Sequence, residues 1–482
     1  MSKQLTQLSF NDIIKTSHSD PYRHKLIELL SHDLDFHDQD SKYASHDFHS
    51  FPAKFPPQLP HKFIHALTKP GDTILDPMSG SGTTVLEAFL NGRRGIAFDI
   101  DPLALLIIRV KVSQYDPYDL LEIGRQMIYN ARISVKIRHS ELRDILSKRW
   151  DKKTKEFIDY WFAPETQIEL LALKTEIEII SDEKLKMFFL LAFSAIIITK
   201  SGGVSLAFDL AHTRPHKAKV AITQTGEFLF GKQLADNTSP RIKLLTKTLR
   251  SPIDEFEKRV RQNIKSILTF ETEGFIDPLV RDGNSESLPL EEASVDLIVT
   301  SPPYASNAID YMRAHKFSLV WLDYPIDHLS LKRKDYIGGE STTGIEFEEM
   351  PPETTKIIRK ISRLDTKKGS VLHRYYSEMK RVLAEMYRVL RPQSAAIVVV
   401  GSSIMRSQDT ETHSCLAEIG KSVGFDVPRI GVRNLDRNRR MLPAGSNVNL
   451  GSQIQQRMHE EYVIGFYKPP TYSFFSADEE HK

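Results

Sequence analysis

Residues 73–90 decide the fold, and their sequence is TILDPMSGSGTTVLEAFL. A short apolar run comes first, then a turn rich in glycine and serine, then apolar residues at helical spacing. This order predicts a strand over 73–76, a tight turn and a helix over 83–90. A second unit of the same kind follows, with a buried strand predicted over 95–101 and a helix over 102–112. Alternating strands and helices predict an α/β fold with a parallel, doubly wound sheet.

The pattern changes between residues 115 and 270, where Leu, Ile, Lys and Glu recur at helical spacing and strand signals are few. We interpret this part as a largely helical insertion. Strand and helix signals resume at 295–300, 375–390, 395–400 and 462–467. Residues 327–370 are polar without clear periodicity and predict a long loop.

Composition narrows the class of protein. The 482 residues allow two or three domains, and 40% hydrophobic with 27% charged residues is typical of a globular chain. The net charge of +2 gives no general argument for a polyanionic partner. A single cysteine, Cys415, excludes a disulfide framework and a multi-cysteine zinc site. The longest apolar run, 187–199, is too short to cross a membrane, and the N-terminus has no signal-type apolar core, so we expect a cytoplasmic protein without a membrane partner.

Three groups of residues suggest chemistry. The first is the turn after the first predicted strand, where glycines let the backbone approach a ligand and Asp76 can accept hydrogen bonds from a cationic amine. It lacks the spaced glycines of a dinucleotide site, and an ordinary glycine-rich turn explains it equally well when it is taken alone. The candidate residues of this turn are Asp76, Pro77, Ser79, Gly80, Gly82, Thr83 and Thr84.

The second group is the end of the next strand. Asp99 stands 17 residues after Gly82, close to the spacing at which nucleotide-binding sheets place an acidic residue on the ribose. Asp101 competes for this role, but we interpret it as a solvated aspartate at the strand end.

The third group is the loop Ser301, Pro302, Pro303 and Tyr304 after the strand at 295–300. Two prolines make the loop rigid. The Tyr304 ring offers a π face to a planar ring, and the Ser301 hydroxyl and nearby carbonyls offer hydrogen bonds to an exocyclic amine.

Together the three groups resemble the S-adenosylmethionine-dependent amino-methyltransferases of DNA, which modify the N4 amine of cytosine or the N6 amine of adenine. The resemblance covers 46–112 and 276–321 closely and 375–468 loosely. It implies a Rossmann-like sheet, S-adenosyl-L-methionine as cofactor, double-stranded DNA as substrate and the loop 300–304 as catalytic. The segment 48–57 is similar to the one that packs over the methionine end of the cofactor, which adds Phe51, Pro52 and Lys54. Asp282 stands where the family places a contact to the adenine ring.

The resemblance also implies a division of the chain into five segments. These are an N-terminal extension (1–43), the cofactor-binding part of the methyltransferase domain (44–113), a mostly helical insertion that is a candidate for target recognition (114–275), the catalytic part (276–470) and a C-terminal tail (471–482).

The residue types restrict the reaction. Methylation at cytosine C5 needs a thiolate next to the catalytic loop, and Cys415 lies far from it in sequence. Transfer to an exocyclic amine needs no covalent intermediate, only hydrogen bonds to the amine and proximity to the methyl group. In the family, serine at the first loop position goes more often with cytosine N4, so Ser301 favours that target, although some serine-type enzymes act on adenine.

Basic residues favour contact with nucleic acid near the catalytic sheet. Arg433, Arg437, Arg439 and Arg440 form the main candidate surface, and a second basic run, 241–265, is equally well explained as a solvated helix face. His46 and His49 lack a convincing set of partner ligands, so we assign no metal.

The leading hypothesis is a site-specific DNA cytosine-N4 methyltransferase in a restriction-modification system, with a cognate restriction endonuclease as a partner. Adenine N6 is the alternative target, followed by an RNA guanine-N2 methyltransferase and a catalytically silent DNA-binding subunit. A nucleotide-dependent oxidoreductase is disfavoured because the glycine pattern of a dinucleotide site is missing.

Overall fold

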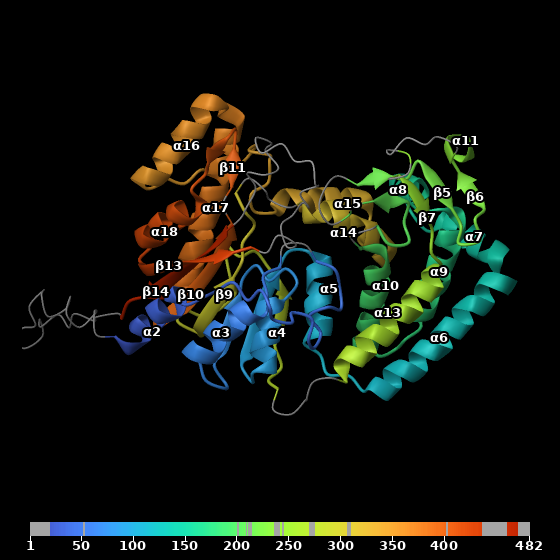
Figure 1. Ribbon diagram of the computed structural model, residues 1–482, viewed down its shortest axis with the longest axis horizontal. Coiled ribbons are helices and arrows are strands. Elements are labelled where there is room, and N and C mark those ends of the chain that lie inside the picture. Colours follow the sequence, from blue (N-terminus) through green and yellow to red (C-terminus); the bar gives the residue numbers. More distant parts are fainter. Residues whose placement is uncertain are drawn as a thin grey trace, which may run out of the picture.

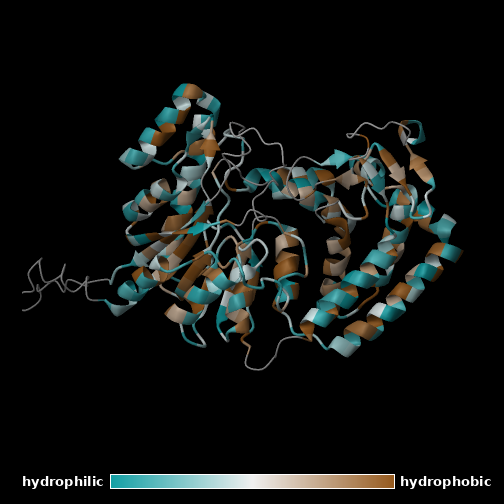
Figure 2. Ribbon diagram, viewed as in Figure 1, coloured by the Kyte–Doolittle hydropathy of each residue, from teal (hydrophilic) through white to brown (hydrophobic). Residues whose placement is uncertain are grey.

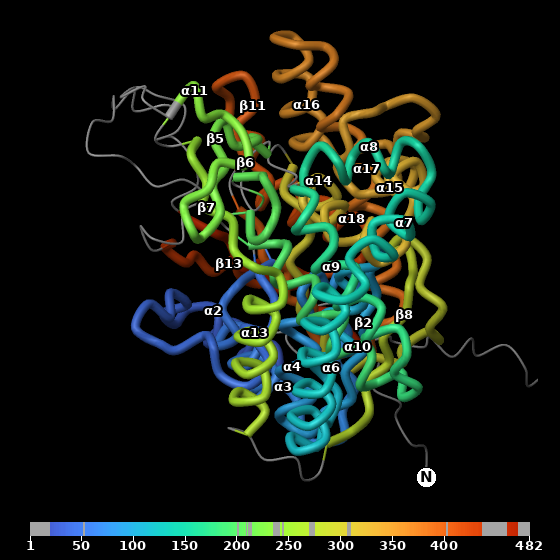
Figure 3. Tube along the Cα trace, turned by 90° about the vertical axis from the view of Figure 1, so that its right-hand side faces the viewer, coloured from blue at the N-terminus to red at the C-terminus, as the bar shows by residue number. Residues whose placement is uncertain are grey.

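The computed structural model describes residues 20–51, 54–199, 202–208, 210, 215–235, 242, 245–268, 275–305, 310–401, 403–435 and 460–470. Two lobes stand side by side, one built on a large sheet and the other mostly on helices (Figure 1). Figure 3 shows the same lobes from the side of the helices. Within the described residues, no helix is both long enough and apolar enough to cross a membrane.

The central sheet has seven strands in the order β13-β14-β10-β9-β1-β2-β8. Their bounds are β1 Thr73–Asp76, β2 Arg94–Asp99, β8 Leu279–Asp282, β9 Val295–Thr300, β10 Leu390–Gly401, β13 Asp426–Asn434 and β14 Glu460–Lys468. The five strands from β8 to β10 are parallel, and β14 runs antiparallel to both β10 and β13. This mostly parallel sheet confirms the predicted α/β fold.

Alternating side chains of the strands supply two separate cores. Leu75 and Ile298 pack with one set of helices, while Ile74 and Leu297, their neighbours in sequence, pack with the other. The first set lies on one face and comprises α16 Pro352–Leu364, α17 Thr366–Val389 and α18 Thr412–Ser422. The opposite face carries α2 Pro21–Ser31, α3 Gln58–Leu67, α4 Thr83–Leu90 and α5 Pro102–Lys111. Apolar strands therefore lie between polar helix surfaces, as the colours of Figure 2 show.

The N-terminal helix α2 belongs to the sheet lobe. Leu26 and Leu30 of α2 are buried against β14, where a Cβ on Gly465 would stand 2.4 Å from Leu30 Cδ1. Strand β14 therefore uses glycine at this position because the helix lies directly on its backbone.

The insertion forms the second lobe. Its helices are α6 Pro117–Ile137, α7 His139–Lys148, α8 Lys152–Trp161, α9 Pro164–Glu178, α10 Glu183–Ile197, α11 Lys232–Ala235 and α13 Pro252–Ile267. Short strands were not evident from the sequence and make two small sheets: β3 Ala207–Phe208 with β4 His216–Lys217, and β5 Val220–Ile222 with β6 Phe228–Phe230 and β7 Thr246–Thr248. Strands of two or three residues are too short for a periodic signal.

The core of the insertion continues into the sheet lobe. Phe162 and Phe193 of the insertion pack against Trp321, with ring centroids 5.5 and 6.4 Å apart. Trp321 lies in η1 Val320–Leu322, directly after α14 Tyr311–Leu319. The helical lobe is thus one hydrophobic cluster with α5 and α14, and its position relative to the sheet is fixed by packing.

The long loop predicted for 327–370 is wrong. This part contains α15 Ile326–Lys332, η2 Arg333–Asp335, all of α16 and the start of α17. In α16 the buried Ile357, Ile358 and Ile361 have helical spacing, but exposed charged and polar residues surround them. This spacing, continued by Leu364, is itself typical of an amphipathic helix and already indicates one, and its buried face packs on α17.

The turn between β1 and α4 depends on a glycine. Gly82 is the N-cap of α4 and has φ +72°, in the left-handed region. A Cβ there would lie 2.8 Å from Ile108 Cγ1 of α5. Both the backbone conformation and the space therefore exclude a larger residue.

We expect Gly82→Ala to lower the free energy of unfolding by about 2–4 kcal/mol, from the left-handed conformation and from the overpacked core. Gly71→Ala is the matched control because Gly71 also has positive φ, at +91°, but no atom lies within 4 Å of the point where a Cβ would stand. Only the backbone cost of about 1–2 kcal/mol applies to the control. Urea unfolding of both variants measures the difference, and equal losses would contradict the packing argument.

Candidate active site

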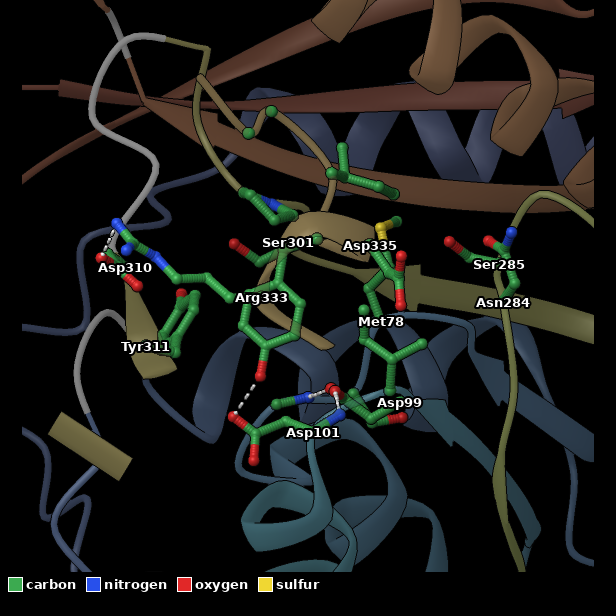
Figure 4. A pocket seen from close by; sticks show the side chains of 18 of the residues that line it. Met78, Asp99, Asp101, Asn284, Ser285, Ser301, Asp310, Tyr311, Arg333 and Asp335 are labelled. Atoms are coloured by element: carbon green, nitrogen blue, oxygen red, sulfur yellow. Dashed lines mark hydrogen bonds and ion pairs between the residues drawn. The ribbon is translucent and has the colours of Figure 1, made fainter. Parts of the chain in front are cut away.

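A cavity of about 500 Å³ opens at the carboxyl ends of β1, β2 and β9. It brings together residues of all three predicted groups, as Figure 4 shows for Asp99 and Ser301. The predicted residues that line it are Phe51, Lys54, Asp76, Pro77, Ser79, Gly80, Thr83, Asp99, Ser301 and Pro303. Those outside its lining are Gly82, Thr84, Asp282, Pro302, Tyr304 and Arg433. Pro52, Arg437, Arg439 and Arg440 lie outside the described residues.

Asp99 joins the two turns at the sheet edge. Its Oδ2 accepts from the backbone N–H of Gly80 at 2.7 Å, and its Oδ1 accepts from that of Asp101 at 2.9 Å. Burial, with the nearby charge of Asp101, raises the pKa of Asp99 to about 7. The carboxylate faces the cavity with lone pairs to spare, so it can accept hydrogen bonds from a diol.

Asp76 lies deeper in the same wall and is 2% exposed. Its Oδ1 accepts from the backbone N–H of Met78 at 3.2 Å, and its carbonyl accepts from Ser79 Oγ at 2.7 Å. Burial raises the pKa of Asp76 to about 6. Thr84 does not reach the cavity, because its hydroxyl donates to the carbonyl of Val299 at 3.0 Å and ties α4 to β9.

The interpretation of Asp101 as a solvated residue is wrong. Asp101 is 3% exposed and caps α5 by accepting from the backbone N–H of Leu103 at 2.8 Å. Its other oxygen accepts from the Tyr336 hydroxyl at 2.9 Å and contacts His315 Nδ1 at 2.5 Å. Burial alone would raise the pKa of Asp101, but His315 and these hydrogen bonds hold it below its usual value. No local pattern indicates these partners, which follow more than 200 residues later.

The segment 330–341 forms a wall that the sequence did not reveal. Arg374 of α17 holds it by donating to the carbonyls of Lys334 and Tyr336, both at 3.2 Å, and to that of Ser341. Arg333 on this wall pairs with Asp310, as Figure 4 shows. No periodicity marks this segment, and only its tertiary contacts fix it over the cavity.

The predicted cover segment lies at the cavity. The Phe51 ring stacks on Tyr311 with centroids 5.3 Å apart, and its edge is 3.2 Å from where a Cβ on Gly80 would stand. Lys54 Nζ donates to the carbonyl of His46 at 2.9 Å, and burial lowers the pKa of Lys54. An aromatic ring and a cation therefore stand beside the glycine turn.

Asp282 ends β8, is exposed and pairs with Lys332 at 3.3 Å. The residues that follow it, Asn284 and Ser285, line the cavity instead (Figure 4). Asn284 and Ser285 therefore offer the polar contact that the sequence had assigned to Asp282.

The catalytic-loop candidates divide between the cavity and the interior. Ser301 and Pro303 line the cavity, while Tyr304 is 9% exposed and lies behind them. The Tyr304 hydroxyl donates to Glu461 Oε1 at 2.9 Å. Burial, together with the charge of Glu461, raises the pKa of Tyr304, so the phenol stays protonated.

Arg433 does not lie on a surface. It is 2% exposed, its Nη1 pairs with Glu461 Oε2 across the β13–β14 ladder, and its Nε donates to the carbonyl of Leu34 at 3.2 Å. Its guanidinium is thus occupied inside the protein, and we do not propose it as a phosphate contact.

The second basic run is largely neutralised where it is described. On α13, Lys258 pairs with Glu255 at 2.9 Å and Arg261 with Glu257 at 2.6 Å. Arg241 and Lys243 lie outside the described residues. These pairs favour the solvated helix face over a phosphate-binding surface.

His46 and His49 have protein partners. His46 Nε2 contacts Glu87 Oε1 at 2.8 Å, and His49 Nε2 contacts Ser194 Oγ at 2.8 Å. Burial lowers the pKa of His46 to about 4 and that of His49 to about 3, so both rings are neutral near pH 7. In the part of the chain with described coordinates, no group of three His, Cys, Asp or Glu side chains could hold a metal ion.

Comparisons with known proteins find DNA methyltransferases. Residues 15–109 match the family model N6_N4_Mtase, described as DNA methylase. Type II methyltransferase M.MvaI of Kocuria varians is 25% identical in an alignment of length 453, which covers 89% of this chain and 92% of that protein. M.MjaII of Methanocaldococcus jannaschii is 23% identical in an alignment of length 414, which covers 69% of this chain and 74% of that protein. M.PvuII of Proteus hauseri is 45% identical over 51 residues, 11% of this chain and 15% of that protein.

Among solved structures, a protein of Thermus thermophilus described as a DNA modification methylase was solved with S-adenosyl-L-methionine. It is 19% identical, and the match covers 39% of this chain and 55% of that chain with a TM-score of 0.20.

Fold, cavity and relatives together support a DNA amino-methyltransferase of the N4/N6 family. The resemblance predicted from the sequence is confirmed at this level.

We expect Arg433→Ala to lower the free energy of unfolding by about 3–5 kcal/mol, because it leaves the buried Glu461 carboxylate without its charge partner. Arg429→Ala is the matched control on the same strand, where the side chain is exposed, and it should change stability by less than about 0.5 kcal/mol. Chemical denaturation measures both. An Arg433 variant as stable as the Arg429 variant, with a shallower salt dependence of DNA binding, would show that Arg433 contacts phosphate after all.

Proposed function

We propose that this protein transfers the methyl group of S-adenosyl-L-methionine to the N4 amine of a flipped-out cytosine at a specific site in double-stranded DNA. It acts in the cytoplasm as the modification enzyme beside a cognate restriction endonuclease. The observation that carries the proposal is the meeting of Asp99 and Ser301 at one cavity, because the first suits a ribose and the second an exocyclic amine.

The cavity residues fit the cofactor. About 500 Å³ is within the usual range for a small-molecule site. Asp99 would accept hydrogen bonds from the two ribose hydroxyls, and Asp76 would accept them from the cationic amine. Asn284 or Ser285 would hydrogen bond to the edge of the adenine ring. Phe51 and Lys54 would cover the methionine end. When bound, the cofactor supplies a methyl group on a sulfonium, which is electrophilic without help from the protein.

Ser301 would act on the target base. Its side chain faces the cavity, so its hydroxyl can hydrogen bond to an amine whose lone pair is otherwise delocalised into the ring. The Pro302–Pro303 pair keeps the Ser301 side chain in place. A base held by Ser301 would then present its amine nitrogen to the methyl group of the cofactor. The base must leave the duplex first.

Cys415 supports the choice of an amine target. It is buried in α18, its Sγ donates weakly to the carbonyl of Thr410 at 3.7 Å, and it does not line the cavity. Burial raises the pKa of the Cys415 thiol to about 11. A protonated, distant thiol offers no nucleophile for C5 chemistry.

Adenine N6 is the alternative target, since it presents the same NH2 group to Ser301. For target recognition we propose the insertion, whose core packs against α14, while the first residues of α14 line the cavity.

The deciding experiment incubates the purified protein with labelled S-adenosyl-L-methionine and unmethylated duplex DNA, digests the DNA and identifies the labelled nucleoside by mass spectrometry. We expect N4-methyldeoxycytidine. Label in N6-methyldeoxyadenosine would keep the site and overturn the target. Absence of label in DNA would overturn the proposed function, and label in RNA instead would replace it with an RNA methyltransferase.

Cofactor binding should depend on pH through Asp99. The ionised carboxylate accepts the ribose hydroxyls, so affinity is full above the pKa of about 7 and falls as the pH drops through it. Between pH 8 and pH 6 we expect about a tenfold rise in the dissociation constant, measured by calorimetry.

Asp99→Asn should weaken binding at pH 8 by about tenfold and remove the Asp99 part of the pH dependence, because an amide cannot ionise. About a twofold change should remain from Asp76, whose pKa is about 6. Asp119→Asn, an exposed aspartate at the start of α6, is the control and should match the wild type. A pH-independent dissociation constant in the wild type would place the ribose elsewhere.

A further inference from the structure

The hydroxyl of Tyr304 is held inside the protein. Tyr304 ends the loop after β9, its ring is buried, and its hydroxyl donates to Glu461 Oε1 at 2.9 Å. Ser301 stands at the other end of the same proline-stiffened loop and lines the cavity. Glu461 therefore holds one end of the short loop whose other end carries Ser301, the residue proposed to contact the target amine.

Glu461 is itself fixed on both oxygens. It is 8% exposed, and its Oε2 accepts from Arg433 Nη1, while Oε1 accepts from Tyr304. Arg433 is anchored in turn by the carbonyl of Leu34. Hydrogen bonds to an ionised carboxylate are stronger and geometrically stricter than neutral ones. The carboxylate can thus hold the phenol in one position.

The sheet itself does not need this carboxylate. The backbone of Glu461 pairs with Gly401 of β10 and with Arg433 of β13, and those ladder bonds form with any side chain. A buried ion pair is often no more stabilising than an apolar pair of the same volume. The Glu461 carboxylate directs one oxygen at Tyr304 of the loop 301–304, so stability alone does not account for this carboxylate.

The geometry points to Glu461 as a positioning residue for methyl transfer: by holding the Tyr304 hydroxyl, it fixes the loop 301–304 and so places Ser301 at the cavity wall. This inference rests on the proposed function of the same cavity. Glu461 touches neither the cavity nor any reacting atom, since it is absent from the lining, and it acts only through Tyr304.

The test is a double-mutant cycle with Tyr304→Phe, Glu461→Gln and the double variant. Tyr304→Phe removes one hydroxyl and keeps the ring. Tyr462→Phe is the matched control, because the Tyr462 hydroxyl also bonds a glutamate of β14, Glu460, at 3.3 Å. Single-turnover methyl transfer and cofactor affinity are measured on the full chain with the DNA that the wild type methylates.

We expect Tyr304→Phe to slow the single-turnover step by about tenfold and to leave the cofactor dissociation constant within about twofold. Glu461→Gln should slow it similarly, the double variant should be no slower than the slower single variant, and Tyr462→Phe should equal the wild type. A merely structural role would shift the unfolding midpoint without this non-additive loss of rate.

A Tyr304→Phe rate within twofold of the wild type, or losses that multiply in the double variant, would overturn the inference. If Glu461→Gln does not fold, a variant that combines Glu461→Gln with Arg433→Met takes its place in the cycle, because that variant removes both buried charges. Wild-type protein that methylates no DNA would instead defeat the proposed function, so the two failures are distinguishable.

Discussion

The site depends on one carboxylate that joins two turns. Asp99 accepts the backbone N–H of Gly80 from the turn after β1 and that of Asp101 from the turn after β2. A backbone hydrogen bond from the Ser79 N–H to the carbonyl of Phe98, at 3.0 Å, also joins these two strand ends, and the carboxylate adds the side-chain link. With it, the glycine turn, the acidic strand end and the cap of α5 form one rigid edge. The cavity is the space between this edge and the loop 301–304, so its shape follows from the sheet.

Those parts of the fold and site that lie in local sequence patterns could be predicted. The strand at Thr73–Asp76, the helix at Thr83–Leu90 and the strand at Val295–Thr300 have the predicted bounds because each has its own apolar periodicity and a turn to end it. Ser301 and Asp99 reach one cavity because parallel strands end at the same edge. Neither step needed information from distant residues.

The rest of the site is set by distant partners. Arg433 stands in a basic run, but its partner Glu461 lies across the β13–β14 ladder, and only that pairing buries it. Asp101 receives His315 and Tyr336 from far along the chain. Arg374 holds the wall at 330–341 through the backbone carbonyls of that segment. Such contacts leave no periodic pattern in the sequence of the segment. Such side-chain partnerships leave no spacing in the sequence.

The strand order has a consequence during synthesis of the chain. In the finished sheet β1 lies between β2 and β9, yet about 220 residues, mostly the insertion, separate Asp76 from Val295. At about 5–20 residues per second, a ribosome needs roughly 10–45 s to make them. For that time one edge of β1 has no neighbouring strand, and unpaired strand edges promote aggregation. The helical lobe cannot complete its core in that time either, because Trp321, on which Phe162 and Phe193 pack, is synthesised after β9.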